Sequence, residues 1–180
     1  MKNRLISIIC MLFLLVGCTS LQGKCAGGIL YGENWACLVV PPENWIMDQK
    51  SFASYGIYGL FYEKDKTLGG DTPIIYINTS KLNSGSDEEL KQYISSDTSS
   101  YQNNGFSVKA YELKNIKEKQ VFTYAFHKGN NFEICAYTRY KDVCFLVILT
   151  AHDEELINEN ISNLETVINN MQYMDASISQ

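Results

Sequence analysis

The chain has 180 residues, of which 46% are hydrophobic and 19% charged, and its formal net charge at pH 7 is −5. An acidic chain gains nothing from counterion release on nucleic acid and offers no polybasic patch to anionic lipid, so nucleic acid is not expected as a partner. Roughly 160 residues follow the N-terminal segment described next, enough for one domain with its own hydrophobic core.

The first 17 residues are organised like a lipoprotein signal peptide. Lys2 and Arg4 make the start basic, and residues 5–16 are almost wholly apolar. This run suits a signal peptide and is shorter than the ~20 residues of a membrane span. Its end, Leu15-Val16-Gly17-Cys18, resembles the lipobox of bacterial lipoproteins, in which the Cys thiol receives a diacylglyceryl group and the leader is removed before it. We therefore expect a leader at 1–17, lipidation of Cys18 and membrane attachment through the lipid anchor.

The mature chain is expected to begin with a lipidated tether at 18–28, followed by one domain at 29–174 and a tail at 175–180. Small and polar residues dominate the tether, which is typical of a flexible linker. Four further cysteines lie beyond Cys18. They are Cys25, Cys37, Cys135 and Cys144. An even number in an exported chain favours at least one disulfide, whereas the alternative is a set of buried thiols that behave as small apolar residues.

The first half of the domain contains three strand signals. Residues 36–40 form a strand-like run that stops at Pro41-Pro42, with Trp45 just after it. Residues 57–63 and 74–79 are rich in aromatic and branched residues, and a polar loop joins them. These two runs therefore predict a hairpin.

A capped helix follows this hairpin. Ser86 and Glu89 have the spacing of a capping box, in which the Ser oxygen accepts a hydrogen bond from the third amide while the Glu reaches back. Leu90, Tyr93 and Ile94 have helical spacing, and the residues around Asn104 end the helix.

After the helix the pattern changes to strands. Residues 106–113, 120–127, 132–139 and 143–150 predict four strands that short polar turns join into an antiparallel meander. The last of these is apolar on both alternating faces, so it should be central and covered on both sides.

Two cysteines lie on consecutive strands of this meander, and the turn between them decides their distance. Cys135 and Cys144 would be directly opposite if the turn centred on residues 139–140. A turn centred on 141–142 separates them by four residues along the ladder, and turn chemistry favours that choice because Asp tolerates turn geometry. A disulfide between Cys25 and Cys37 would instead close a short loop near the start of the domain, and we expect this pairing ahead of Cys135–Cys144.

The final helix carries a one-sided apolar stripe. Its members are Ile157, Ile161, Leu164, Ile168 and Met171. A helix lying on a membrane would be basic on its polar face, but this one has no Lys or Arg. We therefore expect it to pack on the sheet. Strands and helices are segregated along the chain, which predicts the α+β class: an antiparallel sheet meander packed by helices.

The order of these elements resembles the PsbP-like domains. The resemblance rests on Val39-Val40-Pro41-Pro42-Glu43-Asn44-Trp45, followed by a hairpin, a capped helix, a meander and a closing helix. That family includes DcrB-type bacterial lipoproteins and is mostly associated with binding and assembly. The resemblance therefore implies a PsbP-like fold and an interaction module, and it supplies no functional residues.

Catalytic and metal-binding patterns are weak in this sequence. His127 and His152 are its histidines, and neither a zinc-binding spacing nor the Gly-x-Ser-x-Gly motif of a hydrolase is present. We therefore expect no metal, no cofactor and no enzymatic activity. An envelope hydrolase that uses His127 or His152 is the alternative.

Tyrosines give a stronger indication of a functional site than the histidines do. A partly exposed surface for a protein partner could include Tyr55, Tyr58, Tyr62, Tyr76, Tyr124 and Tyr137.

The expected function is that of a lipid-anchored, non-catalytic envelope protein that binds a protein partner or acts in assembly. Thr19 follows Cys18 where an Asp would resemble an inner-membrane retention signal, so the outer membrane, facing the periplasm, is expected if the cell is Gram-negative. A narrower alternative is an inhibitor or immunity lipoprotein, because an acidic domain suits a basic toxin or wall enzyme.

Overall fold

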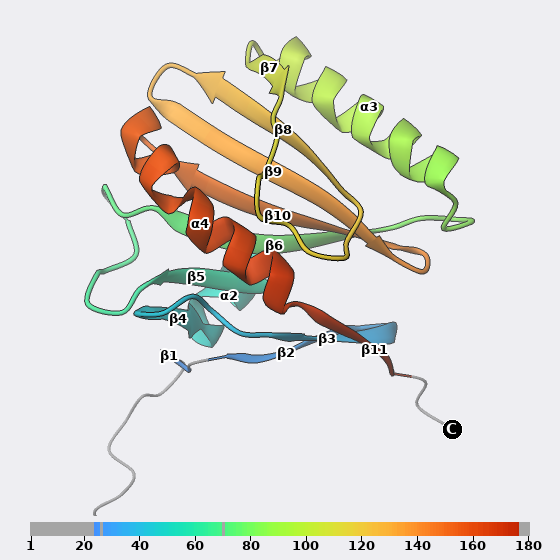
Figure 1. Ribbon diagram of the computed structural model, residues 1–180, viewed down its shortest axis with the longest axis horizontal. Helices are drawn as coiled ribbons and strands as arrows, with labels where there is room; N and C mark the ends of the chain where they lie inside the picture. The colour runs from blue at the N-terminus through green and yellow to red at the C-terminus, as the bar shows by residue number, and fades with distance from the viewer. Residues whose placement is uncertain (1–23, 26, 70, 177–180) are drawn as a thin grey trace, which may run out of the picture.

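A computed structural model describes residues 24–25, 27–69 and 71–176, and within them the chain forms two antiparallel sheets and three helices (Figure 1). The larger sheet contains β1 (Lys24–Cys25), β4 (Trp45–Asp48), β5 (Gly59–Glu63), β6 (Ile74–Lys81), β7 (Ser107–Ala110), β8 (Val121–Lys128), β9 (Asn131–Tyr140) and β10 (Val143–Ala151). The smaller sheet contains β2 (Gly28–Gly32), β3 (Asn34–Val39) and β11 (Gln172–Ala176). The helices are α2 (Gln49–Tyr55), α3 (Asp87–Asn103) and α4 (Glu154–Asn170).

The predicted meander and hairpin are confirmed. The larger sheet has the order β1-β4-β5-β6-β10-β9-β8-β7, so β7 to β10 are neighbours in turn and β5 pairs with β6. Strand β10 lies between β6 and β9 and is buried along almost its whole length, as its apolar sequence predicts. Within the described residues, none of the helices is long and apolar enough to cross a membrane.

The larger sheet separates two hydrophobic cores. One face packs against α4 and the inner side of the smaller sheet, and from β10 it receives Phe145, Val147 and Leu149. The opposite face packs against α3, and from β10 it receives Cys144, Leu146 and Ile148. Successive side chains of a strand point to opposite faces, so the single apolar run of β10 contributes side chains to both cores.

The smaller sheet corrects the predicted ends of the domain. Residues 24–25 pair with β4 and Gly28 begins β2, so the ordered domain starts before residue 29. At the other end β11 continues to Ala176 and pairs with β3, although the sequence analysis placed a tail from residue 175. Neither β11 nor α2 was predicted. The predicted signal peptide and the predicted lipidation site, Cys18, lie outside the described residues.

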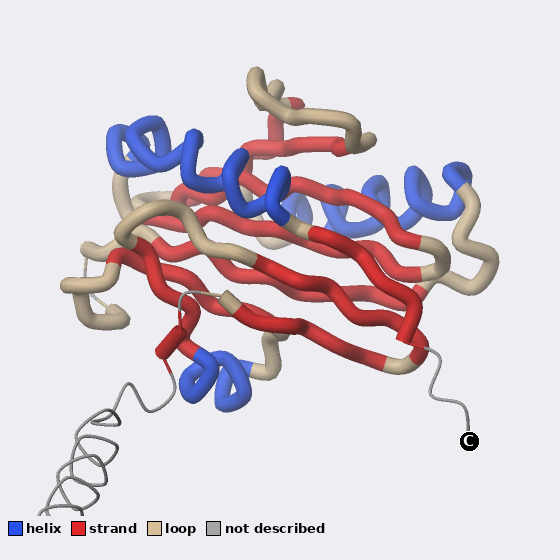
Figure 2. The backbone as a smooth tube through the Cα atoms, turned by 60° about the horizontal axis from the view of Figure 1, so that its bottom comes forward, coloured by secondary structure: helices blue, strands red, loops and turns tan. Residues whose placement is uncertain are grey.

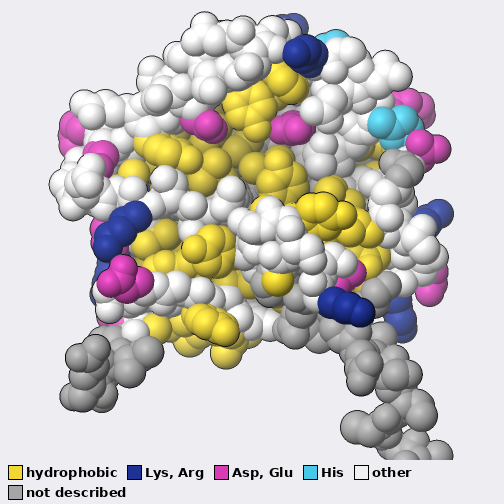
Figure 3. All heavy atoms as spheres, turned by 180° about the vertical axis from the view of Figure 1, so that it is seen from behind, with side chains coloured by type: hydrophobic (Ala, Val, Ile, Leu, Met, Phe, Trp, Pro, Cys, Tyr) yellow, Lys and Arg dark blue, Asp and Glu magenta, His cyan; other side chains and the backbone are white. Residues whose placement is uncertain are grey.

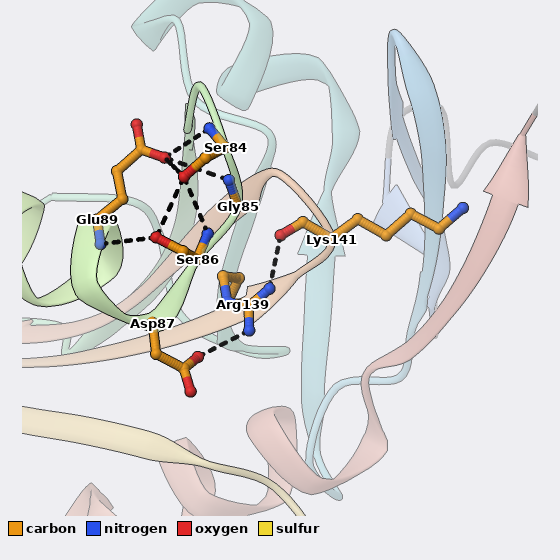
Figure 4. Close-up of polar contacts among 7 residues, drawn as sticks. All are labelled: Ser84, Gly85, Ser86, Asp87, Glu89, Arg139 and Lys141. Carbon is orange, nitrogen blue, oxygen red and sulfur yellow. Dashed lines mark hydrogen bonds and ion pairs between the residues drawn. The ribbon is translucent and has the colours of Figure 1, made fainter.

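The side chains of Ser86 and Glu89 organise the start of α3, and Figure 4 shows their contacts with each other and with Ser84 and Gly85. The Ser86 hydroxyl accepts a hydrogen bond from the amide of Glu89 at 3.2 Å, as the capping box predicts. The Glu89 carboxylate reaches beyond Ser86 and accepts hydrogen bonds from the amides of Asn83, Ser84 and Gly85 at 2.6, 2.7 and 3.2 Å. These bonds lower the pKa of Glu89 to about 2. In a capping box the Glu side chain would accept a hydrogen bond from the amide of the N-cap residue, here Ser86. The Glu89 carboxylate instead binds the amides of the loop that precedes Ser86.

The loop before β8 is held against α4 by two charged side chains. Glu165 is buried, and its carboxylate accepts hydrogen bonds from the amides of Lys114 and Asn115 at 2.7 and 3.0 Å. Burial acts to raise the pKa of Glu165, but the hydrogen bonds outweigh it and the pKa is lowered. Lys119 donates to the carbonyl oxygens of Ile168 and Met171, where α4 leaves its last carbonyls without helical partners. The loop and the helix end thus satisfy each other's polar groups.

Candidate binding pocket

A pocket of about 490 Å³ lies on the α3 side of the larger sheet, over strands that α3 leaves uncovered. Its lining comprises Tyr55, Ile57, Leu60, Leu68, Gly69, Thr72, Ile74, Tyr76, Asn130, Asn131, Thr150, Ala151 and His152. Figure 3, which views the molecule from the side opposite to Figure 1, shows hydrophobic side chains at the surface between polar areas. The volume falls in the range of ligand sites in proteins.

The strand register places the apolar floor of this pocket. Tyr76 on β6 lies opposite Leu60 on β5 and Ile148 on β10, so these side chains share one face. Ile75 and Ile77 point to the other core, which leaves Ile74 and Tyr76 on the face toward the pocket. The floor is therefore apolar because β6 carries large apolar side chains on both faces.

The polar rim comes from the β8–β9 turn and the end of β10. Thr150 donates a hydrogen bond from its hydroxyl to Asn131 Oδ1 at 3.4 Å, and Asn131 Nδ2 donates to Glu133 at 3.1 Å. The same Glu133 accepts a hydrogen bond from the Tyr101 hydroxyl of α3 at 3.2 Å. Burial, with the nearby Glu133 carboxylate, raises the pKa of Tyr76 well above its usual value, so this phenol stays neutral. The rim thus offers neutral amide and hydroxyl groups beside an apolar floor.

Asp48 fixes the position of α2, whose last residue, Tyr55, borders the pocket. The Asp48 carboxylate accepts a hydrogen bond from the buried Tyr62 hydroxyl at 2.7 Å and from the amides of Lys50 and Ser51 at 3.1 and 3.0 Å. Burial acts to raise the pKa of Asp48, and these hydrogen bonds together lower it below its ordinary value. Tyr55 is 67% exposed and stands at the pocket edge.

The two histidines lie at the same end of the sheet but make separate contacts. His152 borders the pocket, and its Nε2 is 3.5 Å from an Asp71 carboxylate oxygen. His127 stacks on Phe132 with ring centres 4.2 Å apart, and its Nε2 is 2.8 Å from the Gly129 carbonyl oxygen. No hydrogen bond joins either ring to a Ser, Thr or Cys side chain in the described part of the chain. Among those residues no group of three or more His, Cys, Asp or Glu side chains is placed to hold a metal ion.

The six tyrosines predicted as an interface do not form one surface. Tyr62 and Tyr137 are buried, and Tyr137 donates to Asp97 at 2.7 Å beneath α3. Tyr124 packs edge-on against Tyr137, whereas Tyr58 packs against Trp35 in the core on the opposite face of the sheet. Of the six, only Tyr55 and Tyr76 line the pocket. The apolar floor of the pocket was not predicted from the sequence, although Ile74 and Tyr76 on the second face of β6 indicate it.

The structure also corrects the expectation of a disulfide. Cys37, Cys135 and Cys144 are free, buried thiols, and the side chain of Cys25 is not described. Cys144 pairs with Arg139 and Cys135 with Ile148, which is the register of a turn at 141–142. The two cysteines are therefore about 13 Å apart along the ladder, beyond the reach of a disulfide. Cys37 lies in the other core, and burial raises the pKa of Cys37 to about 12.

Comparison with known proteins defines the class of fold. No family model and no curated protein matches the sequence. The fold is an α+β domain in which helices cover both faces of an antiparallel meander. Among solved structures it is similar to the solution structure of cyanobacterial PsbP (CyanoP) from Synechocystis sp. PCC 6803, with a TM-score of 0.51 and 15% sequence identity over 88% of this chain and 98% of that chain. The chain therefore has a PsbP-like fold, as the sequence resemblance implied.

Proposed function

We propose that this chain is a lipid-anchored protein of the bacterial cell envelope whose PsbP-like domain is a non-catalytic binding module for a protein partner. The lipobox-like sequence around Cys18 supports the anchor, and Thr19 after it favours the outer membrane, facing the periplasm, in a Gram-negative cell. The binding site is the pocket between β6, the β8–β9 turn and Tyr55.

The observation that carries the binding function is the contrast between the floor and the rim of this pocket. Ile57, Leu68 and Ile74 are partly exposed and offer apolar surface, whereas Asn131 and Thr150 offer neutral donors and acceptors beside it. An apolar or aromatic side chain of a partner would lie on the floor while its flanking peptide groups bond to the rim. The exposed Tyr55 ring adds the large contact area that is typical of protein interfaces.

Photocrosslinking in the native host tests this binding site. A photoreactive phenylalanine at Tyr55 is expected to give one discrete adduct, whereas the same group at the exposed Asn158 of α4 should give none. Ile57→Asp places a carboxylate on the floor and is expected to weaken adduct formation about tenfold.

Tyr55→Ser, an exposed change that cannot disturb the core, should weaken partner binding in the otherwise native protein. Equal adducts from positions 55 and 158, or an adduct that Ile57→Asp leaves unchanged while the urea midpoint is kept, would contradict the proposal.

The lipid anchor has a separate test. Cys18→Ala removes the thiol that the lipobox presents, so the variant is expected to lose label from a fatty-acid analogue and to keep its leader. The Cys10→Ala variant is the matched control, because Cys10 lies inside the leader and should be removed with it. Equal labelling of Cys18→Ala and the parent protein would show that the chain is not a lipoprotein of this kind.

A further inference from the structure

The outer face of the smaller sheet is apolar and exposed. Its inner side chains, Leu30, Trp35, Cys37 and Val39, belong to the core. The register aligns Tyr31, Ala36 and Met174 in one row across the outer face, and Ile29 lies beside Leu38 in the next row. Tyr31 is 75% exposed, Ile29 56% and Met174 40%. Most of the strongly exposed large hydrophobic side chains in the described residues thus gather on this sheet.

This face also carries no charge. Its remaining outward positions are Asn34, Gln172 and Ala176. The nearby charged groups lie at one end of the strands, where Lys81 pairs with Glu33 and Lys141 pairs with Asp175. In Figure 2 the three strands lie at the front, and no helix of the described residues covers them. A flat apolar surface of this kind marks a site of contact with another apolar surface.

We propose that this face lies on the surface of the lipid bilayer to which the chain is anchored, an inference that rests on the proposed acylation of Cys18. At most about 20 Å of extended chain can separate Cys18 from Lys24, the first residue of β1, and β2 follows directly after β1. The N-terminal end of the domain must therefore stay near the bilayer. Figure 1 shows the smaller sheet and α3 at opposite ends of the molecule, so α3 points away from the membrane in this orientation.

The composition of the face determines the kind of contact. Tyr31 suits the headgroup level, where aromatic rings with a polar end are enriched, and Ile29 and Met174 suit the acyl boundary. Without Lys or Arg on the face, attraction to anionic lipid plays no part, and the contact is indifferent to salt. Such a contact strengthens an acyl anchor and fixes the orientation of the domain on the bilayer.

Fluorescence quenching tests this orientation. Tyr31→Trp and the control Gln102→Trp, on the exposed side of α3, are each made in the acylated protein and reconstituted in phosphatidylcholine vesicles with brominated acyl chains. The native Trp35 and Trp45 are buried and supply the background that is subtracted. The tryptophan at position 31 is expected to be blue-shifted and quenched in low and high salt alike, and that at position 102 to show neither change. Adding Ile29→Ser and Met174→Ser is expected to abolish the quenching at position 31.

The outcomes separate the orientation from the anchor. Protein that floats with the vesicles but shows no quenching at position 31 overturns the orientation and leaves the anchor intact. Protein that does not float with the vesicles would contradict the proposed lipid anchor, and also the proposed orientation, which rests on that anchor. A dimer of the acylated protein in detergent that Tyr31→Ser dissociates would assign the face to a second copy of the chain and overturn the lipid contact.

Discussion

Leu164→Asp is expected to abolish folding of the domain. Leu164 is fully buried in the core that α4 shares with both sheets, and an Asp there would place an unpaired carboxylate among apolar side chains. The loss of the leucine contacts adds to this cost, and the total exceeds about 4 kcal/mol. Ile168→Asp, also fully buried one turn later, should have the same effect. Because small domains have about 5–15 kcal/mol of stability in total, either variant should accumulate poorly and lack a cooperative transition.

The control for these variants lies on the same helix. Ser162→Asp, at an exposed position, should change the free energy of unfolding by less than about 0.5 kcal/mol. It is a better control than Asn163 or Asn170, because both are half-buried. Asn163 donates a hydrogen bond to Asn160, and Asn170 donates one to the Val40 carbonyl oxygen. Urea unfolding followed by circular dichroism measures the difference. Equal midpoints for Leu164→Asp and Ser162→Asp would show that α4 does not pack as described.

Gly85→Ala is expected to destabilise the domain by about 2–4 kcal/mol. Gly85 has a φ of +63°, which a side chain tolerates poorly. A Cβ at this position would also lie 2.6 Å from the Lys141 carbonyl oxygen, a backbone atom in the β9–β10 turn. The loop before α3 and that turn would have to separate, which would disturb the amide contacts of Glu89 (Figure 4).

Gly129→Ala measures the conformational part of this effect by itself, so the difference between the two variants gives the steric part. Gly129 has a similar φ of +59°, but a Cβ there meets nothing within 4 Å. This variant should therefore lose about 1 kcal/mol, the cost of the backbone conformation by itself. The comparison needs the urea midpoints of both variants and the parent protein. If both substitutions reduce stability by the same small amount, the close approach of Gly85 to the β9–β10 turn is not a feature of the folded protein.

Much of the fold could be predicted from local patterns. The two-residue period after Gly105 predicted β8, β9 and β10, and the apolar stripe around Leu164 predicted α4 and its buried face. Ser86 marked the start of α3. These predictions succeeded because each depends on residues that are close in sequence, where side-chain direction follows directly from the period of the element.

The pocket could be predicted only in part. Tyr55 and Tyr76 were among the tyrosines considered for an interface, but the other four lie in the cores or elsewhere on the sheet. The pocket exists because α3 covers one half of a sheet face and leaves the other half open. The extent of that cover depends on where α3 packs, and no local pattern in the sequence contains this information.

The sequence by itself determined the α+β class, the meander, both long helices and the turn at 141–142 that separates Cys135 from Cys144, because periodicity, capping and turn chemistry are local. Only the tertiary structure decided that β11 returns to pair with β3, that Glu165 is buried under the 114–115 loop and that an apolar outer sheet face remains exposed. Each of these depends on contacts between residues far apart in the chain. Such contacts form only when packing brings the elements together, because the entropy of closing the long loops between them must first be overcome.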